Sequence, residues 1–331
     1  MSYDIEHFVK WVRANDLTPI LSIHSDDLEL LTHLDLSKKN LKDLPESIGV
    51  LKNLSVLKLS NNKLRKLPKA IGELKNLRNL QCENNLIEEL PSTIGNLPNL
   101  MILNLNVNRL KALPNEFYNL KSLTRLTLAA NRIESLDEDF KKLSKLLYLS
   151  LETNELEDIP DIFENMQQLY YLDLSFNHLA FLPSSLSKIK ELETLVLEGN
   201  SLKELPSLES HDMLLKLDLS DNALKSLDFD VSKLEDLKIL ILDNNLLTKL
   251  PKEICALKNL TMLSVSSNSL EELPELIGDL SNLQELDVED NKLESLPSSI
   301  NNLESLKNLF IDNNKGLTKP ESLELDFCDV K

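Results

Sequence analysis

The sequence has 331 residues, with 36 basic and 54 acidic side chains and a formal net charge of −18 at pH 7. Binding to DNA, RNA or an anionic membrane needs a basic surface, so this charge balance excludes nucleic acids and lipid headgroups as main partners. The chain has only 6 glycines, and none forms a GxG or GxxxxGK cluster of the kind that holds nucleotide phosphates. No run of about 18 apolar residues is present that would insert into a membrane.

The first predicted element is an amphipathic helix over residues 3–14. Its apolar residues follow the i, i+3, i+4, i+7 spacing of a helix with one buried face, and they are Ile5, Phe8, Val9 and Val12. A stack of repeats leaves an apolar end that needs a cover, so we predict that residues 1–30 form an N-terminal cap. A helix that binds a partner is the alternative.

A repeat of 23 residues follows the helix. One asparagine recurs at this step throughout, except for a single step of 22 between Asn200 and Asn222. The phased asparagines are Asn62, Asn85, Asn108, Asn131, Asn154, Asn177, Asn200, Asn222, Asn245, Asn268, Asn291 and Asn314. With Lys39 one step before Asn62, the spacing predicts thirteen repeats over residues 31–320.

Each repeat contains the pattern LxxLxLxxNxL. The alternation in LxL predicts a short strand with one buried face. Proline usually stands six residues past the asparagine, where its fixed φ and missing N–H suit an extended return segment. We expect the asparagines to satisfy backbone groups where the strands end, and the 22-residue step to shorten the return arc at residues 206–213.

The full pattern LxxLxLxxNxLxxLPxxIGxLxx is intact over residues 54–76 and 260–282. It resembles the 23-residue leucine-rich repeat of intracellular Ras-pathway scaffolds, their plant relatives and many bacterial proteins. The resemblance implies an α/β solenoid, a leucine-rich repeat horseshoe with a parallel sheet on its concave face and irregular, 3-10 or extended arcs on its convex face. Residues 321–331 would then form a C-terminal cap or tail.

The residues indicate no catalytic or metal site and no cofactor. The five histidines have neither HxxxH nor HxxE spacing, so nothing supports zinc ligation. Cys82 stands at a core-leucine position, where we expect a buried and inert thiol. The three cysteines form no paired framework, which favours a reducing, cytoplasmic location, with delivery into a host cytosol as the alternative.

Residues beside the strand leucines are expected to project from the concave face, because alternate side chains of a strand point in opposite directions. In the middle repeats these positions are mainly apolar or aromatic, and we select Ile102, Arg125, Tyr148, Tyr170, Tyr171 and Phe176 as partner-binding residues. In later repeats they are acidic, and we select Glu193, Asp218, Glu285 and Asp287. Aromatic residues and arginine are typical of binding hot spots, and acidic groups attract basic partners. Ordinary cross-strand packing and solubility are the alternatives.

The sequence therefore predicts a non-enzymatic protein–protein interaction module, a monomeric scaffold or adaptor. Its partner would be a protein with a basic and apolar surface, held on the concave face. Two alternatives remain open. One is a bacterial effector that engages a host protein, and the other is a regulatory or inhibitory subunit of an enzyme.

Overall fold

A computed structural model describes residues 3–17, 28, 30–317 and 329–330, and the chain divides into two compact units, Met1–Glu155 and Leu156–Lys331. The predicted helix is confirmed as α1 (Tyr3–Ala14), which buries Phe8 and Val12 and contacts the 3-10 helix η2 (Glu46–Val50). Part of the predicted cap (residues 18–27) and most of the predicted tail (residues 321–328) lie outside the described residues. The boundaries at residues 30 and 320 stay predictions.

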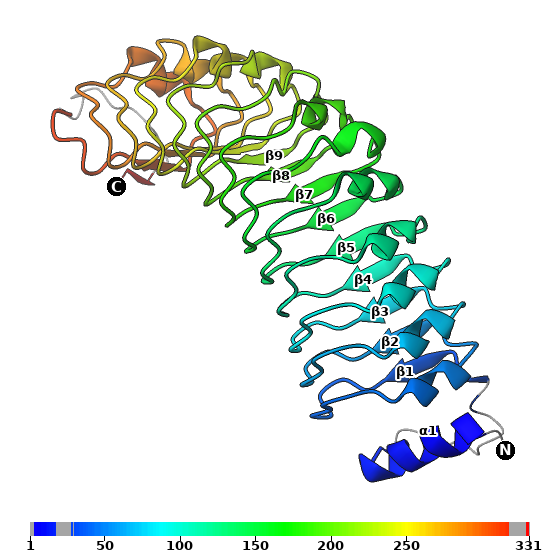
Figure 1. Ribbon diagram of the computed structural model, residues 1–331. Helices are drawn as coiled ribbons and strands as arrows, with labels where there is room; N and C mark the ends of the chain where they lie inside the picture. The colour runs from blue at the N-terminus through cyan, green and yellow to red at the C-terminus, as the bar shows by residue number, and fades with distance from the viewer. Residues whose placement is uncertain (1–2, 18–27, 29, 318–328, 331) are drawn as a thin grey trace. The chain divides into compact units, whose positions relative to one another are not determined.

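The first unit contains one parallel sheet, in which every strand pairs with the next (Figure 1). Its strands are β1 (His33–Asp35), β2 (Val56–Lys58), β3 (Asn79–Gln81), β4 (Ile102–Asn104), β5 (Arg125–Thr127) and β6 (Tyr148–Ser150). The return arcs carry the 3-10 helices η2 (Glu46–Val50), η3 (Lys69–Glu73), η4 (Ser92–Asn96), η5 (Asn115–Asn119) and η6 (Glu138–Lys142).

The second unit repeats this arrangement, again with parallel pairing of each strand to the next. Its strands are β7 (Tyr171–Asp173), β8 (Thr194–Val196), β9 (Lys216–Asp218), β10 (Ile239–Ile241), β11 (Met262–Ser264), β12 (Glu285–Asp287), β13 (Asn308–Phe310) and β14 (Asp329–Val330). Its 3-10 helices are η7 (Phe163–Asn165), η8 (Ser184–Lys188), η9 (Val231–Lys233), η10 (Lys252–Ala256), η11 (Ile277–Asp279) and η12 (Ser298–Asn302). The predicted parallel sheet and 3-10 arcs are therefore confirmed in both units.

Leucines from consecutive repeats stack to form the core. Leu57 of β2 pairs in register with Leu80 of β3, and both side chains are fully buried. Cys82 is fully buried as expected, because it replaces a leucine of this stack. A single repeat could not bury these residues, so the hydrophobic stabilisation comes from contacts between neighbours.

The phased asparagines form the expected hydrogen-bonded ladder. Asn85 is typical: its Nδ2 donates to the carbonyl oxygens of Leu59 and Cys82, each at 3.0 Å, and its Oδ1 accepts from the Leu64 amide at 3.1 Å. One buried side chain therefore satisfies backbone groups of two repeats. This matters because a buried, unsatisfied backbone group costs about 1–3 kcal/mol.

The arc between β8 and β9 is shortened, as the 22-residue step predicts. Residues 206–213 contain turns in place of a 3-10 helix. His211 occupies the core position that Leu74 holds in a regular repeat, and it is fully buried. Its Nδ1 lies 3.0 Å from the carbonyl oxygen of Leu208, and its Nε2 lies 3.1 Å from that of Leu186. The sequence analysis did not anticipate this polar core residue.

No helix among the described residues is long and apolar enough to cross a membrane.

Candidate interaction surface

Each strand from β1 to β13 has three residues, and its central leucine points into the core. The first and third residues of the strand therefore project from the opposite side of the sheet. We call this side, together with the residues directly before and after each strand, the open face. The sequence-selected residues are divided between the open faces of the two units, and each face is described separately.

In the first unit, the structure brings Ile102, Arg125 and Tyr148 together. They are in-register neighbours at the first positions of β4, β5 and β6. The Arg125 guanidinium carbon lies 3.7 Å from the centroid of the Tyr148 ring, which is a cation–π contact. Arg125 is exposed, whereas Ile102 and Tyr148 are half-buried. The contact restrains a long cationic side chain, so less freedom is lost when a partner binds it.

Three further residues lie on this face of the first unit. Met101 is 41% exposed and Val107 is 46% exposed, so both offer apolar surface beside the strand of Ile102. Thr127, at the third position of β5, is buried, and its Oγ1 has no hydrogen-bond partner. The sequence analysis selected neither Met101 nor Val107 for the site, although both are apolar residues at positions flanking a strand.

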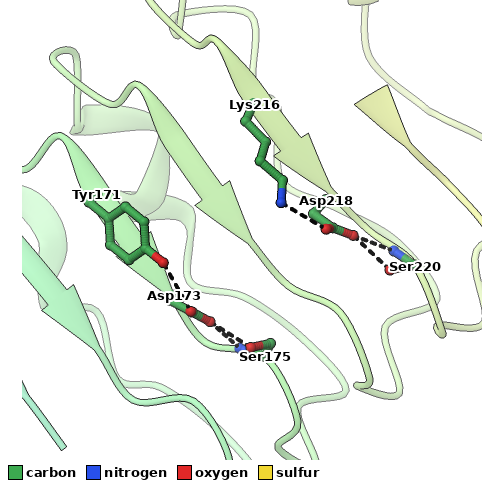
Figure 2. Close-up of polar contacts among 6 residues, drawn as sticks. All are labelled: Tyr171, Asp173, Ser175, Lys216, Asp218 and Ser220. Carbon is green, nitrogen blue, oxygen red and sulfur yellow. Dashed lines mark hydrogen bonds and ion pairs between the residues drawn. The ribbon is translucent and has the colours of Figure 1, made fainter. Parts of the chain in front are cut away.

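In the second unit, Tyr170, Tyr171 and Phe176 come from a single repeat. Tyr170 and Phe176 are exposed, and Tyr171 is half-buried. The Tyr171 hydroxyl donates to Asp173 Oδ2 at 3.2 Å (Figure 2). Asp173 Oδ1 accepts from the Ser175 amide at 3.0 Å and from its hydroxyl at 2.6 Å. This network holds the phenol ring along the strand.

Asp218 corrects one expectation. It was selected as an exposed carboxylate, but it is only 5% exposed. Its Oδ1 accepts from the amide and hydroxyl of Ser220, and Lys216 Nζ lies 3.3 Å from its Oδ2 (Figure 2). The carboxylate is buried because it holds the turn after β9, as Asp173 does after β7. Asp218 is therefore a structural residue that is paired with Lys216.

Carboxylates gather where the strands of the second unit end. Burial raises the pKa of Glu198, and the nearby charges of Asp218 and Asp221 raise it further. Burial also raises the pKa of Asp287 to about 6, in spite of the hydrogen bond from the Glu289 amide. Charges of neighbouring carboxylates add to this rise, so an approaching cation would be attracted.

The other acidic residues selected from the sequence lie on the same open face, where strands begin. Glu285 is half-buried at the first position of β12, where its Oε2 accepts from Asn308 Nδ2 at 3.2 Å. Glu193 is half-buried directly before β8. Its carbonyl oxygen accepts from the amides of Leu215 and Lys216.

An apolar patch at β10 and β11 escaped the sequence analysis. Ile239 and Ile241 occupy both outward positions of β10, and Met262 pairs in register with Ile239. All three are half-buried. The signal was present in the sequence as apolar residues on both sides of Leu240, but the acidic residues of the neighbouring repeats obscured it.

The described residues contain no cluster of three or more His, Cys, Asp or Glu side chains that could hold a metal ion. Burial raises the pKa of the Cys82 thiol far above its usual range and that of Cys255 to about 11. Both thiols stay protonated near neutral pH, so neither is an activated nucleophile.

Comparisons with known proteins agree with this architecture. A family model described as a leucine-rich repeat region matches residues 20–106, 54–158 and 197–310, and a leucine-rich repeat model matches residues 168–189. A leucine-rich repeat protein of Leptospira interrogans is 34% identical, with a TM-score of 0.77 over 92% of this chain and 90% of that chain. A search among curated proteins gave no match.

Two more solved structures are similar. An internalin of Listeria monocytogenes is 23% identical and has a TM-score of 0.83 over 96% of this chain and 93% of that chain, a similarity that concerns the fold alone. The ectodomain of the Arabidopsis receptor kinase HAESA, solved in complex with a peptide hormone, is 26% identical with a TM-score of 0.68. That match covers 85% of this chain and 53% of the receptor chain.

Proposed function

This chain belongs to the leucine-rich repeat family, whose members act as protein-interaction modules, and on that premise we propose that it binds a protein partner on its open face. The contact of Arg125 with Tyr148 is the observation that carries the proposal. An exposed arginine held on an aromatic ring is typical of a binding hot spot, because it combines apolar area, charge and low conformational freedom. The HAESA ectodomain, solved with a peptide ligand, supports the use of such a fold for binding a polypeptide.

We further propose that the chain is a non-enzymatic, cytoplasmic monomer, a scaffold or adaptor that binds neither nucleic acid nor membrane. Two buried, unpaired cysteines, Cys82 and Cys255, support a reducing environment. The net charge of −18 supports a protein partner rather than a polyanion. The open face is the surface that we expect to be concave.

Affinity capture from the native cell followed by mass spectrometry tests this proposal. The wild-type chain is compared with a double variant, Arg125→Ala with Tyr148→Ala, and with Phe176→Ala. Phe181→Ala is the matched control, because Phe181 is an exposed phenylalanine outside the strands and their flanking positions. We expect a protein that is retained by the wild type and by Phe181→Ala but lost by the double variant. Equal retention by all variants at unchanged melting temperature would contradict binding at the open face.

The identity of the captured protein also separates the two alternatives. A host protein, together with a positive translocation reporter, would indicate a bacterial effector. An enzyme whose activity falls when this chain is added would indicate an inhibitory subunit.

A further inference from the structure

The open face of the second unit has an apolar centre with acidic groups on both sides. Ile239, Ile241 and Met262 form the centre, on β10 and β11. On one side, in the repeats of β8 and β9, lie Glu198 and Asp221. On the other side, β12 contributes Asp287 and is followed by Glu289. Asp243 follows β10 itself and borders the centre.

The charges on this face differ between the two ends of the strands. The carboxylates just named lie at or after the strand ends. The strand starts carry both signs, with Lys238 and Lys307 directly before β10 and β13, Glu193 directly before β8 and Glu285 at the first position of β12. Lys216 is paired with the buried Asp218 and so compensates that carboxylate. The edge where the strands end is therefore acidic beside an apolar patch, and a partner must be basic along this edge to match it.

Burial raises the pKa of Glu198 on one side of the patch and of Asp287 on the other, and repulsion from neighbouring carboxylates raises both further. Asp218 and Asp221 act on Glu198, and Asp243 and Glu289 act on Asp287. Bringing a cation to either side would relieve this repulsion. The hydrogen bonds that hold the turns use the Oδ1 atoms of these carboxylates. Asp243 Oδ1 accepts from the Ser264 hydroxyl and the Ser266 amide, and Asp287 Oδ1 accepts from the Glu289 amide.

The spacing of the two acidic sides limits the sequence of the partner. β9 and β12 are three strand steps apart through β10 and β11. At about 4.8 Å a step, the separation is about 14 Å. An extended chain covers this distance in about four residues, and its first, third and fifth side chains point the same way.

We propose that the open face of the second unit binds an extended protein segment with two basic residues four positions apart and an apolar residue midway between them. The apolar side chain lies on Ile239, Ile241 and Met262, and the basic side chains meet Glu198 with Asp221 on one side and Asp243 with Asp287 on the other. The bound segment runs across the strands near their C-terminal ends. This inference rests on the proposed function, and it names the class of partner.

Isothermal titration calorimetry at low ionic strength tests the proposal, using synthetic peptides whose two termini are blocked. The probe is a glycine–serine peptide with lysine, leucine and lysine at alternate positions. Control peptides keep the composition but place the lysines side by side, or replace the leucine by serine. We expect each control to bind at least about tenfold more weakly, the equivalent of about 1.4 kcal/mol. Equal affinity for the side-by-side peptide would overturn the proposal, because unspecific charge attraction would then be sufficient.

Variants of the protein locate the binding. The double variant Asp243→Asn with Asp287→Asn keeps the oxygen acceptors of both turns. We expect it to lower the affinity for the probe peptide about tenfold. Asp236→Asn is the matched control, because Asp236 is an exposed carboxylate on a return arc. Equal weakening by both variants would overturn the location. A probe that fails to bind while cellular capture still depends on Arg125 and Tyr148 would refute this inference and leave the proposed function standing.

Discussion

The ring of Phe176 lies against Gly199: a Cβ atom placed on Gly199 would come within 2.5 Å of Phe176 Cδ1. Both residues stand directly before a ladder asparagine and have left-handed backbones, with φ of 51° at Phe176 and 65° at Gly199. Glycine adopts this conformation without strain and leaves the space that the ring fills. The position of one candidate binding residue therefore depends on a glycine in the following repeat.

We expect Gly199→Ala to lower the free energy of unfolding by about 1–3 kcal/mol, because it adds left-handed strain and a clash with the ring. In a Phe176→Ala background the clash disappears, so the same change should cost less. Chemical denaturation of the two single variants and the double variant gives this coupling. Strictly additive losses would mean that the ring does not rest on Gly199.

His211 leads to an expectation about pH. Burial lowers its pKa below the usual value, although the carbonyl oxygens of Leu208 and Leu186 act in the opposite direction. An unfolded chain therefore binds the proton more readily than the folded chain, and ∂ΔG/∂pH is positive. Stability is complete above the unfolded pKa of about 6.5 and falls as the pH drops below it.

The test compares wild-type stability with that of His211→Leu between pH 5 and about 7.5. The variant has the regular core residue, and both carbonyl oxygens keep a backbone donor, the amide of residue 211 for Leu208 and the Ile189 amide for Leu186. Only the one hydrogen bond that a neutral imidazole donates is lost, so we expect a loss of about 0.5–1.5 kcal/mol at neutral pH. The loss should shrink towards acid pH, because only the wild type is destabilised when His211 binds a proton in the unfolded chain. His178→Asn is the control for removal of an exposed imidazole. A pH-independent difference would contradict the assignment.

The repeat pattern predicted the fold because its leucines, asparagines and prolines each have a role that recurs in most repeats. Asn85 binds backbone groups at fixed offsets, so its spacing alone indicates its role. Asp218 shows where this reasoning stops. Its strand position predicts exposure, but a serine two residues later draws the carboxylate into the turn. Such pairs occur in only some repeats, and periodicity carries no information about them.

The phased glycines of the return arcs give a comparison within one unit. A Cβ on Gly95 would come within 2.0 Å of the backbone oxygen of Glu116, whereas one on Gly49 would meet the end of the Glu73 side chain at 2.9 Å. A side chain can move aside and a stacked backbone cannot. We therefore expect Gly95→Ala to cost about 1–3 kcal/mol and Gly49→Ala clearly less, as measured by denaturant unfolding. Equal losses of unfolding free energy in the two variants would mean that neighbouring return arcs move apart easily to make room for a methyl group.

Asp287 provides the opposite pH dependence to His211. Its folded pKa of about 6 lies above the unfolded value of about 3.9, so the folded chain binds the proton more readily. The stability contributed by this group is present below pH of about 4 and is lost as the pH rises through about 6. At neutral pH the ionised carboxylate is thus a cost that the fold retains, as expected for a group that is used to attract a partner.

Asp287→Asn removes this cost while keeping an oxygen that can accept from the Glu289 amide. We expect it to stabilise the protein by about 1 kcal/mol at pH 7, since partial solvent screening reduces the about 1.4 kcal/mol for each pKa unit. Thermal unfolding of the two proteins should converge below pH of about 4 and separate as the pH rises. Should the variant be less stable than the wild type at pH 7, the carboxylate would contribute favourable contacts to the fold, and its retention would need no explanation through binding.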